Sequence, residues 1–280
     1  MDRNLKTLLI KYGFSFKKAY GQNFLTDENL LDDIVKSAGV TDADNVLEIG
    51  CGAGALTRSL AKTAKRVVGY EIDENLRPIL SETVGGFSNV EIVFKDALKE
   101  PLSEVEKKLG EEYIMVANLP YYITTPVVMK FIENSDKIKG LVIMVQEEVA
   151  KRFSAAPGSA DYGAVTVGIN LRGNAKIVKY VGREMFTPVP NVDSAVVKID
   201  MNKEKFKGTD FAAVREAVKC GFLSRRKMLV NNVMNYYKVS RKAAEEILAT
   251  ADIEQDKRGE TLSAEDYIRL SDSVKIFFAK

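Results

Sequence analysis

The feature that most constrains the fold is a short apolar run that ends in three alternating glycines, Val46-Leu47-Glu48-Ile49-Gly50-Cys51-Gly52-Ala53-Gly54. The apolar residues of this run are typical of a buried parallel strand. The glycines remove side chains where the backbone has to turn sharply and approach a ligand. Because an amphipathic stretch follows, the segment predicts a strand, a tight turn and a helix. In open α/β sheets, ligands bind where such turns follow the carboxyl ends of strands.

Acidic residues follow the next two apolar runs. The run 66–71 ends at Glu71, and the run 90–94 is followed by Asp96. A carboxylate at the position of Glu71 can accept hydrogen bonds from both hydroxyls of a ribose, and one at the position of Asp96 can accept a hydrogen bond from the amino group of an adenine. NAD enzymes share the first acid, and the glycine turn also satisfies the relaxed dinucleotide pattern. The second acid favours S-adenosylmethionine, and the alternative is that both acids are solvated strand ends.

The tetrapeptide Asn118-Leu119-Pro120-Tyr121 follows a fourth apolar run and indicates the chemistry. The lone pair of an exocyclic base amine is delocalised into the ring, so an enzyme that methylates this nitrogen has to make the lone pair available. The side-chain carbonyl of Asn118 and the backbone carbonyls at Leu119 and Pro120 can accept the amine hydrogens and turn the lone pair towards a methyl group. Tyr121 can stack on the base. The alternative is a proline turn with packed tyrosines. The chain contains no histidine, which argues against triad and histidine-based acid–base chemistry.

Together these motifs resemble those of the ribosomal RNA adenine dimethyltransferases that modify two adjacent adenosines near the 3′ end of small-subunit rRNA. The matching segments span most of the chain: 20–25 (YGQNFL), the glycine turn, Glu71, Asp96, 118–121 and 186–197 (FTPVPNVDSAVV). A helical tail with LSRRK at 223–227 and RGETLS at 258–263 is similar to that of the bacterial members. One departure is Cys51, where many members carry proline.

The resemblance implies an enzyme that transfers methyl groups from S-adenosylmethionine to N6 of two adjacent adenosines in a 3′-terminal hairpin loop of 16S rRNA. The product is N6-dimethyladenosine, and a role in small-subunit biogenesis is implied. The expected partner is small-subunit rRNA or the immature small ribosomal subunit. The residues that the resemblance implies as cofactor contacts are Asn23, Leu25, Gly50, Gly52, Glu71, Asp96 and Asn118. Because the adenosines have to be unstacked, a loop is favoured over a regular duplex.

Phe186 and the cationic residues near both ends of the chain complete the expected site. Phe186 is expected to clamp the adenine ring opposite Tyr121, and the alternative is a core phenylalanine that closes the sheet. Lys17 and Lys18 lie among aromatic residues in a basic N-terminal arm, a pattern that suits phosphate contacts and base stacking. The segment Arg225-Arg226-Lys227 is expected to open a helix, where phosphate meets both cations and free amides. For both clusters the alternative is a solvated or structural role.

Three other functions remain open. A large-subunit rRNA adenine methyltransferase of the antibiotic-resistance type has similar motifs, although Tyr121-Tyr122 and the segment 186–194 favour the small-subunit type. A DNA adenine methyltransferase uses a similar turn but usually needs a larger target-recognition region than the tail offers. A ribosome-assembly factor in which catalysis is secondary or lost is the third, and the retained acids and tetrapeptide argue against a vestigial site.

The predicted architecture is α/β. Residues 1–204 are expected to form a Rossmann-like, seven-stranded S-adenosylmethionine-dependent methyltransferase domain with the basic arm, and residues 205–280 a small all-α domain that binds rRNA. Alternation of strands and helices from 45 to 147 indicates a parallel sheet. Further strands are expected at 163–171, 175–182 and 194–200. Thr26 is expected to cap a helix that ends before Gly39.

Composition places the chain among globular proteins and limits its partners. The net charge is only +2, but lysine and arginine outnumber acids at both ends of the chain, which modestly favours RNA. Cys51 and Cys220 form no metal-binding pattern and suit a reducing cytoplasm. The sequence contains no apolar run of about 18 residues and no apolar leader, so neither a membrane span nor a signal peptide is indicated. We therefore expect a cytoplasmic protein without a metal, and a monomer.

Overall fold

The computed structural model describes residues 3–17, 20–25 and 27–279 and divides into two compact units. The first comprises Met1–Ala150 and Asn174–Asn202, and the second comprises Lys151–Gly173 and Lys203–Lys280. The boundary expected after residue 204 lies two residues from the observed one. Residues 151–173, which we expected in the first domain, group with the helical unit instead.

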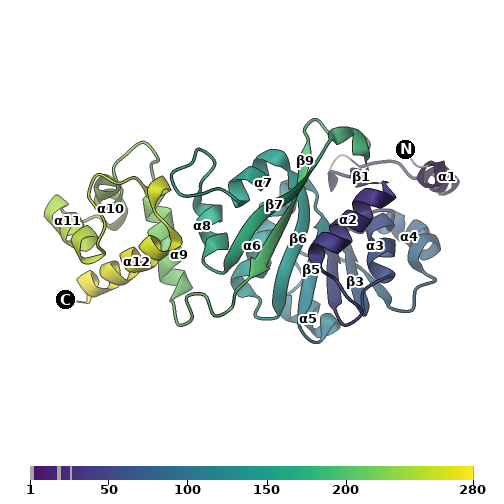
Figure 1. Ribbon diagram of the computed structural model, residues 1–280, viewed down its shortest axis with the longest axis horizontal. Helices are drawn as coiled ribbons and strands as arrows, with labels where there is room; N and C mark the ends of the chain where they lie inside the picture. Colours follow the sequence, from purple (N-terminus) through teal and green to yellow (C-terminus); the bar gives the residue numbers. More distant parts are fainter. Residues whose placement is uncertain (1–2, 18–19, 26, 280) are drawn as a thin grey trace. The chain divides into compact units, whose positions relative to one another are not determined.

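A seven-stranded sheet forms the centre of the first unit, with strand order β4-β3-β2-β5-β6-β9-β7 (Figure 1). The pairs β2–β3, β2–β5, β3–β4 and β5–β6 are parallel, and β9 runs antiparallel to β6. The strands are β2 (Asn45–Ile49), β3 (Arg66–Glu71), β4 (Val90–Phe94), β5 (Tyr113–Asn118), β6 (Ile138–Gln146), β7 (Gly173–Val181) and β9 (Ser194–Met201). The predicted α/β fold is therefore confirmed.

Among the described residues, the α-helices that lie wholly in this unit are α1 (Arg3–Lys11), α2 (Glu28–Ala38), α3 (Ala55–Ala61), α4 (Arg77–Val84), α5 (Leu102–Leu109) and α6 (Thr124–Asn134). In α2 the buried residues recur at helical spacing: Leu30, Leu31, Ile34, Val35 and Ala38. The cap of α2 is Asp27, whose side chain accepts from the amide of Leu30, and not Thr26, which lies outside the described residues. Gly39 ends the helix in the left-handed conformation that favours glycine.

A two-stranded sheet joins two motifs that are far apart in the sequence. Strand β1 (Phe24–Leu25) pairs antiparallel with β8 (Phe186–Thr187), so that Leu25 lies opposite Phe186. Both residues are buried in the core cluster that includes Leu31 and Val46. The N-terminal motif and the proline-rich loop therefore share one packing arrangement.

The strand predicted at 163–171 is wrong, because this segment forms helix α8 (Ala164–Asn170). Its run of β-branched residues has a high strand propensity, which tertiary packing overrides. The hydroxyl of Thr166 accepts the amide of Gly163 at 3.2 Å and donates to the carbonyl of Arg152 at 2.6 Å, and both bonds fix the helix start. The seven strands of the sheet are complete without this segment.

Helices dominate the second unit: α8 with α9 (Phe211–Gly221), α10 (Leu229–Tyr237), α11 (Arg241–Thr250) and α12 (Ala264–Phe278) (Figure 1). Helix α7 (Glu147–Phe153) spans the boundary between the units. The second core includes Tyr162, whose hydroxyl donates to the carbonyl of Leu262 at 2.8 Å. No helix among the described residues is long and apolar enough to cross a membrane, and within the same ranges no group of acids and cysteines has the arrangement of a metal site.

Candidate active site

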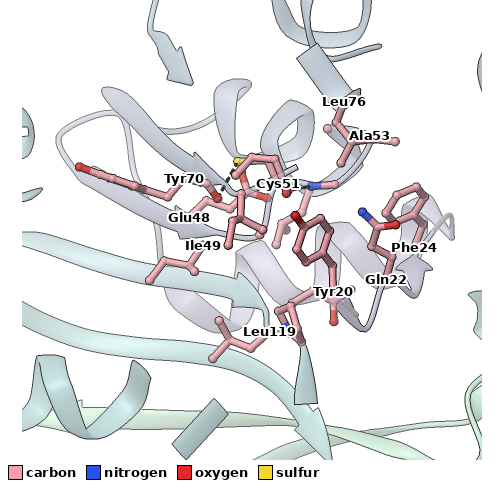
Figure 2. Close-up of a pocket in the computed structure, with 18 of the residues that line it drawn as sticks. Tyr20, Gln22, Phe24, Glu48, Ile49, Cys51, Ala53, Tyr70, Leu76 and Leu119 are labelled. Atoms are coloured by element: carbon pink, nitrogen blue, oxygen red, sulfur yellow. Dashed lines mark hydrogen bonds between the residues drawn. The ribbon is translucent and has the colours of Figure 1, made fainter. Parts of the chain in front are cut away.

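A pocket lies at the carboxyl ends of β2, β3 and β5 and beside the loop that follows β4 (Figure 2). Figure 2 shows Glu48, Ile49 and Cys51 from the sheet side and Tyr20, Gln22 and Phe24 from the N-terminal arm around this space. The lining comprises residues 20–25, 48–56, 70–72, 95–98 and 118–123, together with Leu5, Leu8, Leu31, Arg58, Leu76 and Thr83. All the residues that we predicted to bind the cofactor lie in it.

The glycine turn has the backbone that its sequence predicts. Gly50, Gly52 and Gly54 have φ values of 81°, 55° and 85°, which side-chain-bearing residues rarely adopt. A Cβ on Gly54 would lie 2.7 Å from the Thr83 hydroxyl oxygen, and one on Gly52 would lie 3.1 Å from the ring of Phe24. The three glycines therefore keep this side of the pocket open.

Cys51 lies in the turn as a buried side chain, with its sulfur 3.7 Å from the carbonyl oxygen of Tyr70. A Cβ on Gly69 would lie 2.5 Å from this sulfur, so the thiol occupies space that only a glycine in β3 provides. Burial and the nearby carboxylates raise the pKa of the thiol well above its ordinary value. Cys51 is thus a packing residue here, and the departure from proline leaves the turn intact.

Glu71 ends β3 with both carboxylate oxygens fixed. One oxygen accepts the amide of Asp73 at 2.8 Å and the other accepts the amide of Gly52 at 2.9 Å. Burial raises the pKa of the Glu71 carboxyl, and these amide hydrogen bonds act in the opposite direction. Each oxygen has a second lone pair, so the carboxylate can still accept a pair of hydroxyls.

Asp96 lies at the pocket edge beyond β4. Its Oδ1 atom accepts the amide of Leu98 at 2.9 Å, and Lys99 Nζ lies 3.7 Å from Oδ2. These contacts hold the carboxylate at one end of the pocket. Since β3 and β2 separate β4 from β5 in the sheet, this end lies farthest from Asn118. The two acids are therefore not simply solvated strand ends.

Glu48 is an additional acid of the pocket that our sequence reasoning did not single out. Its side chain is fully buried, and neither carboxylate oxygen accepts a hydrogen bond from the residues described in the structure. Burial raises the pKa of Glu48 to about 8, with a further contribution from Glu71. At neutral pH Glu48 is therefore mostly protonated and able to donate a hydrogen bond.

The tetrapeptide 118–121, which we predicted to be catalytic, is fixed by several hydrogen bonds. The side-chain amide nitrogen of Asn118 donates to the carbonyl of Asn23 at 3.2 Å, which fixes the side chain so that its oxygen faces away from Asn23. The amide of Leu119 donates to the carbonyl of Met144 at 3.3 Å. The carbonyl of Pro120 already accepts the amide of Ile123 at 3.1 Å and the hydroxyl of Thr124 at 3.3 Å.

The two aromatic residues predicted to clamp the base have different surroundings. Tyr121 lines the pocket, and its hydroxyl shares a 2.8 Å hydrogen bond with the hydroxyl of Ser194, a fully buried residue that begins β9. Phe186 is only 2% exposed and packs in the core with Leu25 and Val196. The position of Phe186 thus corresponds to the alternative we considered, a core phenylalanine, because its pairing with Leu25 points the ring into the cluster.

The N-terminal arm is bonded to Asp73, a residue that sequence reasoning did not single out although it stands two positions after Glu71. Lys17 Nζ lies 2.7 Å from one oxygen of Asp73, and the side-chain amide nitrogen of Gln22 donates to the other at 2.9 Å. Burial alone would raise the pKa of Asp73, but these bonds hold it below its ordinary value. Lys17, predicted to contact RNA, is therefore paired within the chain, and Lys18 lies outside the described residues.

The aromatic residues of the arm and the cations of the tail have other environments. The rings of Phe14 and Phe16 lie 5.9 Å and 5.2 Å from that of Phe24, which favours an anchoring role for both. In the second unit, the exposed cations of 225–227 precede α10 as predicted. Arg225 contacts Glu260 at 3.3 Å and donates to the carbonyl of Ala160, while Arg226 and Lys227 are exposed. RNA binding by this cluster stays a prediction.

Comparisons with known proteins found similar proteins that match nearly the whole chain. The profile of the family described as ribosomal RNA adenine dimethylase matches residues 13–274. A protein of Bacillus licheniformis named ribosomal RNA small subunit methyltransferase A is 44% identical over 277 residues, which cover 96% of this chain and 95% of that protein. A protein of the same name from Clostridioides difficile is 42% identical over 272 residues, which cover 96% of this chain and 94% of that protein.

Two solved structures are similar over nearly the whole chain. A dimethyladenosine transferase from Plasmodium falciparum has a TM-score of 0.78 and 27% identity, and the match covers 91% of this chain and 98% of that one. The 23S rRNA methyltransferase ErmE has a TM-score of 0.69 and 28% identity, covering 90% of this chain and 100% of that one.

Proposed function

Because the chain belongs to the ribosomal RNA adenine dimethylase family, we propose that it transfers methyl groups from S-adenosylmethionine to N6 of two adjacent adenosines in the 3′-terminal hairpin loop of small-subunit rRNA. The product is N6-dimethyladenosine. The observation that carries the proposal is the fixed side chain of Asn118 at the end of a pocket that also holds Glu71 and Asp96.

The pocket fits S-adenosylmethionine by the chemistry of its donors and acceptors. Glu71 holds two acceptor oxygens for ribose hydroxyls, and Asp96 offers an acceptor for an adenine amino group. The positive-φ glycines provide a backbone cradle that any Cβ at Gly52 or Gly54 would narrow. The buried, unpartnered Glu48 leaves polar capacity for a ligand in the same pocket. When bound, the cofactor supplies an electrophilic methyl group on a sulfonium.

Asn118 and Leu119 perform the positioning step. The amide nitrogen of Asn118 is engaged by Asn23, so the side-chain oxygen is the atom that accepts a hydrogen from the adenine amine. Of the two backbone carbonyls we considered, that of Pro120 already has two donors, so the carbonyl of Leu119 is the second acceptor. Two acceptors held in fixed positions orient the nitrogen lone pair and need no reorganisation at the moment of transfer.

Tyr121 supplies one stacking face for the base. Its ring lines the pocket and is fixed at its hydroxyl by Ser194, so stacking costs little further ordering. Phe186 acts as the opposite face only if the β1–β8 packing opens, and we therefore assign it to the core. After transfer the cationic nitrogen loses its proton readily, so the chain needs no strong general base here.

Small-subunit rRNA is the substrate that the comparisons favour. The relatives at 41–45% identity carry the small-subunit name over 96% of the chain, whereas the large-subunit enzyme ErmE is 28% identical. The exposed cations at 225–227 suit contacts with the rRNA backbone. We further propose a cytoplasmic monomer, a setting that suits two buried free cysteines, Cys51 and Cys220; light scattering in solution tests the monomer.

The test is transfer of tritium from S-adenosylmethionine to isolated small subunits that lack dimethyladenosine, compared with large subunits and adenine-containing duplex DNA. We expect N6-dimethyladenosine in small subunits only, with loss of transfer in Asn118→Ala. Label in large subunits or DNA would contradict the substrate. Cofactor binding without transfer to any of the three would favour the assembly-factor alternative.

A further inference from the structure

We propose that Lys130 is a positioning residue for the adenine of the cofactor, because its side chain fixes the loop that carries Asp96. The inference rests on the proposed function in that the ligand is an adenosine-containing cofactor. Lys130 belongs to α6, the helix that follows the catalytic tetrapeptide, and lies 34 residues beyond Asp96 in the sequence. It does not line the pocket itself, so any effect on the ligand passes through the loop.

The ammonium of Lys130 is bonded to one short stretch of backbone. Its nitrogen donates to the carbonyl oxygens of Ala97 at 2.8 Å, Leu98 at 3.0 Å and Glu100 at 2.6 Å. An ammonium has three donors, and three carbonyls accept them here. The Glu100 carboxylate is engaged separately by Lys95, so Lys130 acts on the shape of the backbone rather than on that side chain.

One of these carbonyls links Lys130 to Asp96. The carbonyl of Ala97 and the amide of Leu98 belong to the same planar peptide group and point in opposite directions. The carbonyl accepts from Lys130, and the amide donates to Asp96 Oδ1 at 2.9 Å. A cation at the carbonyl end polarises the peptide and strengthens the bond at its amide end. Lys130 therefore sets the orientation of the carboxylate that faces the pocket.

The rest of the loop is built around the same carboxylate. The backbone carbonyl of Asp96 accepts hydrogen bonds from the amides of Lys99 and Glu100 at 3.1 Å and 3.0 Å, so residues 96–100 form a tight turn. The carbonyls of Ala97, Leu98 and Glu100 in this turn accept from Lys130. Without the ammonium, the carbonyls of Ala97, Leu98 and Glu100 would lose a common donor and the turn could relax. We expect the cost to appear in recognition of the adenine amino group, because Asp96 is its acceptor.

The experiment measures whether Lys130 controls that recognition. Calorimetry gives the Kd of S-adenosylhomocysteine and of S-inosylhomocysteine, which carries an oxygen in place of the adenine amino group. The proteins are the full chain, Lys130→Met, Asp96→Ala, the double variant, and Lys137→Met as a matched control, since Lys137 donates to the single carbonyl of Gly110. Lys130→Gln, which keeps two donors on a shorter chain, takes the place of Lys130→Met if the latter unfolds.

We expect the full chain to prefer the adenosyl ligand by about tenfold or more, as for a hydrogen bond to a charged group. Lys130→Met should lose most of that preference, as Asp96→Ala does, and the double variant should lose no more, whereas Lys137→Met should keep it. Equal weakening of both ligands in Lys130→Met, or an unchanged preference, would overturn the inference alone. A full chain that binds neither ligand would overturn the proposed function and the inference with it.

Discussion

The hydrogen bond between Tyr121 and Ser194 gives a sharp test of how the stacking ring is held. We predict that Tyr121→Phe and Ser194→Ala each slow methyl transfer by the same factor, although Tyr121→Phe retains the aromatic ring and Ser194 does not line the pocket. The two hydroxyl oxygens are 2.8 Å apart, and Ser194 is fully buried. The shared cause is loss of the bond that fixes the ring plane.

The size of the effect follows from the burial of each partner. A neutral hydrogen bond contributes about 0.5–1.5 kcal/mol, which corresponds to roughly 2- to 12-fold in rate if the bond is needed to orient the ring. In Tyr121→Phe the buried Ser194 hydroxyl loses its partner, which costs about 1–3 kcal/mol of stability. In Ser194→Ala the stranded hydroxyl belongs to Tyr121, which faces the pocket and can turn to water, so the stability loss is smaller.

Single-turnover methyl transfer to small subunits, and unfolding in denaturant, measure the two effects. The double variant should react at the rate of either single variant, because one bond is lost in all three. Tyr180→Phe is the control, since this tyrosine is 60% exposed and does not line the pocket, and it should leave the rate unchanged. Rates that multiply in the double variant, or a normal rate in Tyr121→Phe beside a slow Ser194→Ala, would refute a role for the bond.

Four further predictions concern other parts of the pocket. Asn118→Ala should lower the single-turnover rate about 10²- to 10³-fold, as for loss of a preorganised polar contact; rapid-quench rates within tenfold of the unmodified chain would argue against the two-acceptor geometry. Glu71→Gln should weaken cofactor binding at least about tenfold by calorimetry, because a charged acceptor is lost, and an unchanged Kd would remove Glu71 from the ribose site. Glu48→Gln should be more stable than the unmodified chain at pH 8 by several kcal/mol. The pKa of Glu48 is about 8 in the folded chain, above the ordinary 4.5. The free energy of unfolding of the unmodified chain therefore falls by about 1.4 kcal/mol per pH unit between these two values, and that of the glutamine variant does not. Denaturant unfolding at pH 5 and pH 8 checks this, and a gain independent of pH would contradict it. Gly54→Ala should destabilise the chain by about 1–3 kcal/mol and by more than Gly39→Ala. Both positions have positive φ, but only a Cβ at Gly54 would clash with a neighbour, the Thr83 hydroxyl oxygen at 2.7 Å. Equal losses of stability in thermal unfolding would show that this clash is unimportant.

Local patterns were sufficient to predict the pocket. Glu71 and Asn118 end strands, the glycine turn and Asp96 follow strands, and the carboxyl ends of parallel strands meet at one edge of a sheet. The order of the strands was not needed to bring these residues together, only their parallel direction. Strand identity failed where packing opposed propensity, as in the helix at Ala164–Asn170.

Other features depend on contacts that no pattern announces. The motif around Phe186 suits either a residue that clamps the base or a core residue. Only the β1–β8 pairing shows that its side chain faces the core cluster that contains Leu25. Lys130 reads as an ordinary helix lysine, because its three acceptors are backbone carbonyls, which every residue carries. The pairing of Lys17 with Asp73 is likewise set by the path of the arm and not by its composition.

The discontinuous second unit limits how the tail can be exchanged or removed. Tyr162, Val167 and Leu171 come from the insertion at residues 151–173, yet they are buried with α9 to α12. A deletion that stops the chain at 202 would strand the Tyr162 hydroxyl, whose acceptor is Leu262, and would uncover the apolar side of α8. A chimera that takes the tail of a relative therefore has to take residues 151–173 of that relative as well, so the two segments are expected to be inherited as one module.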